Sequence, residues 1–324
     1  MQAITDTIND ITLGEPVVFQ GLTLFPVFGG DRPDPGYETL DMALEQEQAR
    51  VVEVSDEGDV PELLFDNFGS QRVLLVDGDE LIGAKQNRII NLTILVAAQS
   101  KIEIPVSCVE AGRWSYNSHE FRSKGRSMYS RARATKAAHV SQRMAASGDR
   151  RADQSAVWDE VEGMACALEV SSSTDSMSDI YDDYEDDLAD YQAAFKAQEG
   201  QVGAVFAVDG KVQGLELFDS STTFAHYLER LVSSYALGSL RSAAKEGEVT
   251  LSSVEGFIEG LKRSKTKQFD ALGEGEDVRI SGEALAGGAL VAEGRLVHLA
   301  AFNLDDTGSV VRRYPSHWYD GPVE

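Results

Sequence analysis

The stretch GAVFAVDGKVQGLELF, residues 203–218, decides the fold class of this chain. Two mostly apolar runs flank Asp209-Gly210, and an Asp-Gly pair in that setting is among the strongest local signals for a β-hairpin. The pattern recurs near the C-terminus, where apolar residues 289–291 and 295–302 flank Glu293-Gly294. We therefore expect the last third of the chain to build an antiparallel sheet.

The first 110 residues predict more strands, beginning with a hairpin around Gln20-Gly21. Residues 89–96 form a nearly continuous aliphatic run, which predicts one strand buried on both faces. Pro105 has no N–H for ladder pairing, so we expect its strand, residues 102–106, to lie at a sheet edge or to carry a bulge. Other strands are expected at 51–54, 60–65 and 73–76.

Helical spacing of apolar residues appears at residues 39–46, 154–168, 178–195, 224–235 and 253–264. In segment 178–195 the apolar residues recur at intervals of three and four. This spacing places them in a stripe along one face of a helix, opposite a face of carboxylates. Ser178 is the expected N-cap of that helix. The stripe consists of Tyr181, Tyr184, Leu188, Tyr191 and Phe195.

The charge changes sign abruptly in the middle of the chain. Residues 113–151 hold ten basic and two acidic residues, a net of +8, whereas residues 153–199 hold fourteen acidic residues and one basic residue, a net of −13. We expect the basic stretch 122–143 to pack against acids between 153 and 190, with the aromatic stripe supplying most of the stability. The alternative is that this stretch faces solvent and binds phosphates.

Together these patterns predict an α+β fold. Its β-rich core, sandwich or barrel-like, is expected to combine residues 12–112 and 201–303 and to carry packed helices. Residues 113–200 are expected to form a helical, charge-segregated insertion, and residues 304–324 a C-terminal tail.

Composition narrows the class of function. The 324 residues include 29 basic and 54 acidic side chains, a formal net charge of −25. Such a charge disfavours nucleic acid and anionic membrane surfaces as partners. Residues 1–6 lack a signal-peptide pattern, and no apolar run reaches the length of about 18 residues that a membrane span needs. With only Cys108 and Cys166, we expect a reduced cytoplasmic protein without a disulfide framework.

The sequence lacks the short motifs that indicate a specific chemistry. The sequence has no phosphate-binding Gly-x-x-x-x-Gly-Lys-Ser/Thr loop, no Gly-x-Ser-x-Gly elbow, no Cys-x-x-Cys pair and no His-Glu-x-x-His helix. Its five histidines are scattered, with none paired at metal-ligand spacing. We therefore expect neither a metal nor a cofactor.

Two polar blocks flank the aliphatic run and the strand that returns from it. Residues 80–88 (ELIGAKQNR) precede the run, and residues 108–114 (CVEAGRW) end the returning strand. If these strands are antiparallel neighbours, the blocks meet at one edge of the sheet and offer guanidinium groups for an anion and an indole for stacking. The expected ligand-binding residues are Lys85, Gln86, Arg88, Glu110, Arg113 and Trp114.

The same blocks allow other interpretations. Glu80, Arg88, Glu110 and Arg113 have the charges of a structural ion-pair network that needs no ligand. In a catalytic interpretation, Glu80 or Glu110 is a general base, or Cys108 is a nucleophile whose pKa a nearby cation lowers. A cysteine in a strand is more often a small buried hydrophobe.

Residues 77–88 and 104–114, which contain the two blocks, resemble a prokaryotic domain family of unknown function, named for its association with ADP-ribosylglycohydrolase, rhodanese and phosphatase-superfamily proteins. Residues 154–158 and 203–218 are similar to its later blocks, so the resemblance spans most of residues 12–303. The name implies a link to ADP-ribose or nucleotide chemistry, including prokaryotic conflict systems. It carries no established reaction and no catalytic residues.

Three functions remain open on this basis. The first is an accessory protein that binds a small anionic, nucleotide-like or ADP-ribose-like ligand, for which Arg113→Ala is expected to abolish ligand-induced thermal stabilisation without unfolding the chain. The second is a hydrolase or transferase acting on such a ligand. The third is a structural scaffold that forms homo-oligomers or binds a protein partner.

Overall fold

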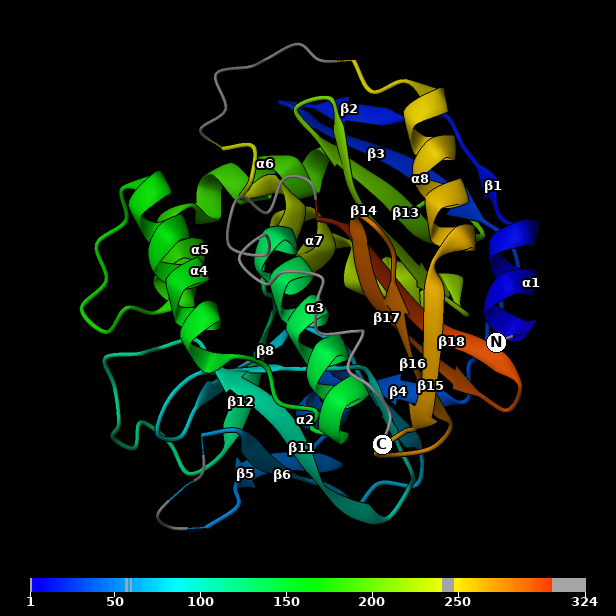
Figure 1. The fold of residues 1–324 in the computed structure, drawn as a ribbon. Coiled ribbons are helices and arrows are strands. Elements are labelled where there is room, and N and C mark those ends of the chain that lie inside the picture. Colours follow the sequence, from blue (N-terminus) through cyan, green and yellow to red (C-terminus); the bar gives the residue numbers. More distant parts are fainter. Residues whose placement is uncertain (1, 56–57, 59, 241–247, 305–324) are drawn as a thin grey trace, which may run out of the picture.

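A large antiparallel sheet forms one side of the molecule (Figure 1). The computed structural model describes residues 2–55, 58, 60–240 and 248–304. The strand order is β1-β3-β13-β14-β18-β17-β16-β15, with β2 paired to β3. The bounds are β1 Thr12–Leu13, β2 Val17–Phe19, β3 Leu22–Phe28, β13 Gln201–Val208, β14 Lys211–Phe218, β15 Lys265–Asp270, β16 Glu276–Ser281, β17 Leu285–Ala292 and β18 Arg295–Asn303.

The three predicted hairpins of this sheet are confirmed: β2 pairs with β3, β13 with β14, and β17 with β18. The reason is local, because both turn residues of each hairpin have positive φ. At Asp209 and Gly210, for example, φ is 50° and 80°. Such turns match the right-handed twist of the strands they join, and glycine adopts this φ without steric cost.

The large sheet buries apolar side chains on both faces. Helices α1 (Gln2–Asp10) and α8 (Leu251–Arg263) cover one face, where Val205 lies in their core. The neighbouring residues Ala204 and Phe206 belong to the core on the other face, as the two-residue period of a strand requires. That face packs against α3 (Ser130–Ser147), α7 (Ser221–Ala236) and the remaining strands.

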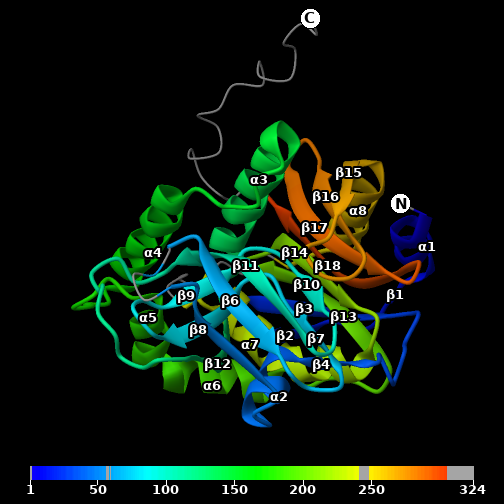
Figure 2. The same cartoon turned by 90° about the horizontal axis from the view of Figure 1, so that it is seen from below.

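The remaining strands form two smaller sheets (Figure 2), of order β10-β7-β4 and β12-β8-β9-β11-β6-β5. Helix α2 (Leu40–Glu45) follows β4. The bounds are β4 Tyr37–Thr39, β5 Ala49–Glu53, β6 Glu62–Asn67, β7 Arg72–Leu75, β8 Asp79–Gly83, β9 Arg88–Ile90, β10 Ile94–Val96, β11 Ser100–Cys108 and β12 Phe121–Ser127.

The aliphatic run 89–96 is not one strand, and this prediction is wrong. It divides into β9 and β10, which belong to different sheets. The polar residues Asn91 and Thr93 make the break possible, because their groups find partners there. The Asn91 N–H donates to the Pro105 carbonyl at 3.0 Å, and the Thr93 hydroxyl lies 2.8 Å from His298 Nδ1 on β18.

The edge position expected for Pro105 is confirmed only locally, because β11 as a whole lies between β9 and β6, whereas residues 100–105 pair with β6 alone. The missing N–H is tolerated because Pro105 sits where pairing changes. Residues 100–105 pair with β6, and pairing with β9 begins at Val106. The proline therefore marks a change of partner.

The predicted aromatic helix is two helices, α5 (Met177–Asp183) and α6 (Glu185–Ala194), which meet at Tyr184. The N-cap is Ser176, whose hydroxyl accepts from the Ser178 N–H, and not Ser178. The stripe itself is buried as expected, with Tyr181, Leu188, Tyr191 and Phe195 in the core. Helix α4 (Gln154–Leu168) precedes this pair, as predicted.

The packing of basic on acidic segments is confirmed in part. Lys124 and Arg126 both pair with Asp182, and Arg131 pairs with Glu160. Two other cations behave differently, because Arg133 and Lys136 on α3 are buried and pair with acids outside the acidic segment. Arg133 pairs with Glu216, and Lys136 with Asp77.

The predicted α+β class is confirmed. Segment 113–200 contains α3 to α6 and also β12, an edge strand of the six-stranded sheet. Its division from the core as an insertion stays a prediction. Among the described residues, none of the helices combines the length and apolar character that crossing a membrane requires.

Candidate functional site

The two polar blocks lie side by side, as their predicted strand pairing requires. Strands β9 and β11 are antiparallel neighbours, and Cys108 is the register partner of Arg88. The first block is itself a hairpin, in which β8 pairs with β9 through Glu80 and Ile89. This pairing places the turn 84–87 beside the end of β11.

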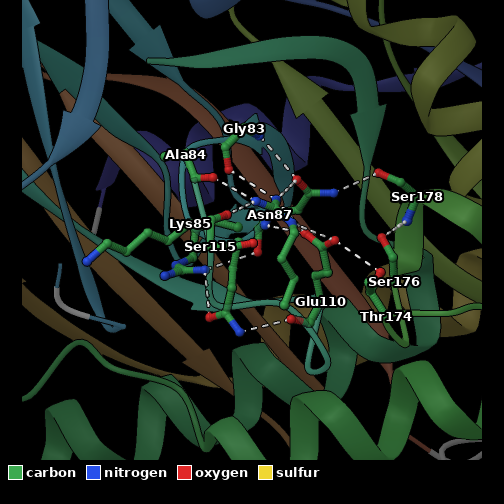
Figure 3. Close-up of polar contacts among 12 residues, drawn as sticks. Gly83, Ala84, Lys85, Asn87, Glu110, Ser115, Thr174, Ser176 and Ser178 are labelled. Carbon is green, nitrogen blue, oxygen red and sulfur yellow. Dashed lines mark hydrogen bonds and ion pairs between the residues drawn. The ribbon is translucent and has the colours of Figure 1, made fainter. Parts of the chain in front are cut away.

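The Glu110 carboxylate organises this turn (Figure 3). Its Oε2 accepts from the Asn87 N–H at 3.0 Å, and its Oε1 accepts from the Thr174 hydroxyl at 3.0 Å. Gln86 Nε2 donates to the Glu110 carbonyl at 3.0 Å. Since these bonds engage both carboxylate oxygens before any ligand is considered, the geometry favours a structural role for Glu110 over general-base catalysis.

Arg113 uses all of its donors within the protein. Its Nε and Nη2 form a bidentate pair with Glu110, at 2.8 Å and 2.6 Å. Nη1 donates to the carbonyls of Ala84 and Ser115, and Nη2 also contacts the Gly83 carbonyl and Asn87 Oδ1. Arg113 therefore holds the two blocks together, and no N–H group remains for an anion.

Arg88 is the opposite case. Its side chain is fully buried, and only Nη1 donates, to Gln86 Oε1 at 3.1 Å and to the Asn87 carbonyl at 3.4 Å. Within the described residues, Nε and Nη2 have no hydrogen-bond partner, and no carboxylate forms an ion pair with this guanidinium. Burial lowers the pKa of Arg88. A buried cation with two unused donors is costly for folding and calls for an anionic partner.

The Trp114 ring lies close to both Arg88 and a second cation, Lys85. The Trp114 ring centroid is 5.8 Å from the Arg88 guanidinium carbon and 5.3 Å from Lys85 Nζ. Lys85 Nζ is also 5.1 Å from the Tyr116 ring. Both rings are about half exposed, at 48% for Trp114 and 47% for Tyr116. The cluster thus joins a buried cation to an aromatic surface that solvent reaches.

The four-residue ion-pair network is wrong as a whole. Of these four described residues, only Glu110 and Arg113 pair with each other. Glu80 instead accepts from the Ser178 hydroxyl at 2.8 Å, its Oε2 has no partner, and burial raises its pKa to about 7. Such a pKa suits a general base, but the carboxyl is fully buried, so a catalytic role for Glu80 stays a prediction.

Cys108 shows the features of a buried hydrophobe. Its thiol is enclosed and free of any disulfide, and burial raises its pKa, which disfavours the thiolate that a nucleophile needs. Gln154 bonds both main-chain groups of Cys108, at 2.8 Å each, and so continues the ladder of β11 with a side chain. Among the described residues, no group of three or more His, Cys, Asp or Glu side chains is arranged to hold a metal ion.

The comparison with protein families gives one result for nearly the whole described chain. The profile of the ARG and Rhodanese-Phosphatase-superfamily-associated Protein domain, ARPP-1, matches residues 10–302. The chain belongs to this family. No curated protein and no solved structure matches it, so the roles of residues in this ARPP-1 domain rest on its own geometry.

Sequence reasoning missed one wall of the ARPP-1 site, the segment 172–178. Thr174 bonds Glu110, and Ser178 bonds both Glu80 and Asn87. Gly112 packs so closely on this wall that an added Cβ would lie 2.9 Å from the Thr174 Cα. In the sequence, Ser178 indicated only a helix start, since nothing in the spacing links this segment to the distant strand end.

The network predicts that Arg113→Ala destabilises this ARPP-1 domain by about 2 kcal/mol, the scale of lost hydrogen bonds to charged groups. The change removes a mostly buried clamp and leaves Glu110 without its counter-ion. Chemical denaturation measures the difference. If the Arg113→Ala chain is as stable as the parent, Arg113 does not hold the two blocks together, and it is again a candidate for ligand binding.

Proposed function

We propose that this ARPP-1 domain binds a small anionic ligand of the nucleotide or ADP-ribose class at the Arg88 site. Arg88 and Lys85 supply positive charge, and Trp114 supplies the surface on which a base stacks. The observation that carries the proposal is the buried Arg88 guanidinium with two unpartnered donor nitrogens, Nε and Nη2. The family description, which names an association with ARG, supports the ligand class.

Two further features support this assignment. Glu53 is also buried, with Oε2 unpartnered, and it is close enough to Arg88 to act on its pKa. The site therefore offers an acceptor as well as donors, which suits a ligand that carries both phosphate and hydroxyl groups. Trp114 covers Arg88 and is half exposed, so movement of this side chain gives a ligand access to the guanidinium.

Calorimetric titration of the full chain with ADP-ribose tests the proposal. We expect Trp114→Ala to weaken binding about tenfold or more, since stacking of a base on an aromatic ring contributes about 1–3 kcal/mol. Phe68→Ala is the matched control, because Phe68 is an equally exposed ring, at 52%, outside the site. Undetectable ADP-ribose binding, or equal losses in the two variants, would overturn the proposal.

Arg88→Met separates binding from folding. The change removes a desolvated charge and two unsatisfied donors while keeping a long apolar side chain. We expect the ligand-free variant to unfold at the parent temperature or above it, and to lose ADP-ribose binding. If Arg88→Met lowers the unfolding temperature markedly, Arg88 serves the fold and the proposal fails.

A further inference from the structure

A cavity of about 650 Å3 lies between α2, α7 and the middle of β12, apart from the Arg88 site. Its lining includes Asp41 from α2 and two residues of α7, His226 and Arg230, which are one helical turn apart. Arg122 and Lys124 of β12 line it as well. Its size lies within the usual range for small-molecule sites.

The inner wall of this cavity is a chain of charged groups. His226 Nε2 lies 3.0 Å from Asp41 Oδ2 and 3.2 Å from the Thr39 hydroxyl. Arg230 Nη2 bonds the same Asp41 oxygen, and Nη1 reaches Asp79 Oδ1 at 3.1 Å. Asp41, Asp79 and Arg230 are all more than nine-tenths buried.

Two acceptors on this wall have no partner among the described residues. Asp41 Oδ1 is buried and makes no hydrogen bond. Because a carboxylate can only accept, His226 Nε2 donates its N–H to Asp41, and the other ring nitrogen, Nδ1, carries a lone pair and is an acceptor. Burial lowers the pKa of His226, which keeps the ring neutral. The wall therefore offers acceptors to a ligand with hydrogen-bond donors.

The charge of the wall determines which hydrogen-bond donor group of a ligand fits it best. One guanidinium, that of Arg230, is shared between the two carboxylates of Asp41 and Asp79. Beside the Asp41–Arg230 pair, the carboxylates of Glu45 and Glu229 also line this side of the cavity. A primary ammonium group, with three N–H donors and a positive charge, fits this wall better than a neutral hydroxyl.

The β12 side of the cavity carries the opposite charge. Lys124 is engaged with Asp182, at 3.1 Å, but Arg122 forms no ion pair within the described residues. A guanidinium binds carboxylate or phosphate in bidentate fashion. The cavity is therefore acidic on its α2 and α7 side and basic on its β12 side.

We propose that this cavity binds a small zwitterion, whose ammonium group contacts Asp41 and His226 and whose carboxylate or phosphate contacts Arg122. The shared chemistry is an amine and an anion separated by a few bonds. It is found in free amino acids and in phosphorylated amines. This site is independent of the Arg88 site and uses none of its residues.

Calorimetric titration of the full chain with four probes tests the pairing of charges. L-alanine and O-phosphoethanolamine carry both groups, ethanolamine carries the amine alone, and acetate the anion alone. We expect at least one zwitterion to bind about tenfold or more tightly than either half, because each half forms only one of the two charge-assisted contacts. The zwitterion that binds more tightly indicates whether the natural ligand carries a carboxylate or a phosphate. If neither zwitterion exceeds both halves, the proposal is wrong.

Two variants and a control place the binding in this cavity. Arg122→Gln is expected to weaken the zwitterion about tenfold and to leave ethanolamine unchanged, whereas His226→Gln is expected to weaken both. The matched control is Arg263→Gln, on α8, whose side chain lines a different cavity. Equal losses for Arg122→Gln and Arg263→Gln would overturn the assignment. Trp114→Ala is expected to have no effect, so failure here is distinct from failure at the Arg88 site.

Discussion

Replacing Arg133 with methionine is expected to lower the free energy of unfolding by about 3–5 kcal/mol, the cost of breaking a buried ion pair from one side. Arg133 on α3 is fully buried, and its Nη1 and Nη2 lie 2.6 Å and 3.3 Å from the two oxygens of Glu216 on β14. Methionine keeps much of the side-chain volume. It leaves Glu216, also fully buried, without its guanidinium.

Urea denaturation of parent and variant measures this loss. Arg50→Met is the control, because Arg50 forms a surface pair with Asp66 at 2.9 Å and its loss is expected to cost less than about 1 kcal/mol. The double variant Arg133→Met/Glu216→Leu is expected to recover most of the stability, since it removes both charges. If Arg133→Met loses as little free energy of unfolding as Arg50→Met, Glu216 does not need Arg133 as its counter-ion.

The parts of the fold that the sequence predicted are those with local causes. The Asp209-Gly210 turn needs only two residues with positive φ, so the hairpin is visible in the chain itself. The aliphatic run 89–96 carries no such signal, because continuous apolar character is the same for one strand and for two. Its division depends on partners far away in the sequence, such as His298 for Thr93.

The buried charges of helix α3 were not predictable for the same reason, because their partners are distant in the sequence. Arg133 and Lys136 resemble ordinary surface residues in a basic stretch, and the sequence suggested acidic neighbours in the next segment. Their actual partners, Glu216 and Asp77, lie on a strand and a turn that only the folded chain brings near. Charge counting therefore predicted the range 153–190, in which Asp182 pairs with Lys124 and Arg126, but it did not predict the buried pairs.

The candidate site divides in a similar way. The assumption that the two strands beside these blocks pair antiparallel was enough to predict that residues 80–88 and 108–114 meet. The register of Arg88 with Cys108 confirms the meeting, although β10 lies between β9 and β11 in the chain. The sequence could not show which arginine has unpartnered donors. Arg88 and Arg113 look alike until the hydrogen bonds that each guanidinium makes are counted. The Asp41–His226 cavity joins residues 185 positions apart, and no motif connects them.

The pH dependence of stability follows from Glu80. Burial raises the pKa of this carboxyl from 4.5 to about 7, against the Ser178 hydroxyl and the charges of Arg126 and Lys124, which lower it, while Asp182 raises it further. The folded chain therefore keeps a proton on Glu80 at pH values where the unfolded chain has lost it. The contribution of Glu80 to stability is full below about pH 4.5 and falls as the pH rises through 7.

Glu80→Gln is expected to remove this dependence. Glutamine matches the protonated acid in shape and can accept from Ser178 as Glu80 does at 2.8 Å. A shift from 4.5 to about 7 corresponds to about 3 kcal/mol, so the variant should gain that much over the parent between pH 4 and pH 8. The measurement is the difference in free energy of unfolding between the two chains across this range, in which other titrating groups cancel. A difference that stays constant with pH would show that Glu80 is ionised in the folded chain throughout, with its charge compensated by Arg126 and Lys124.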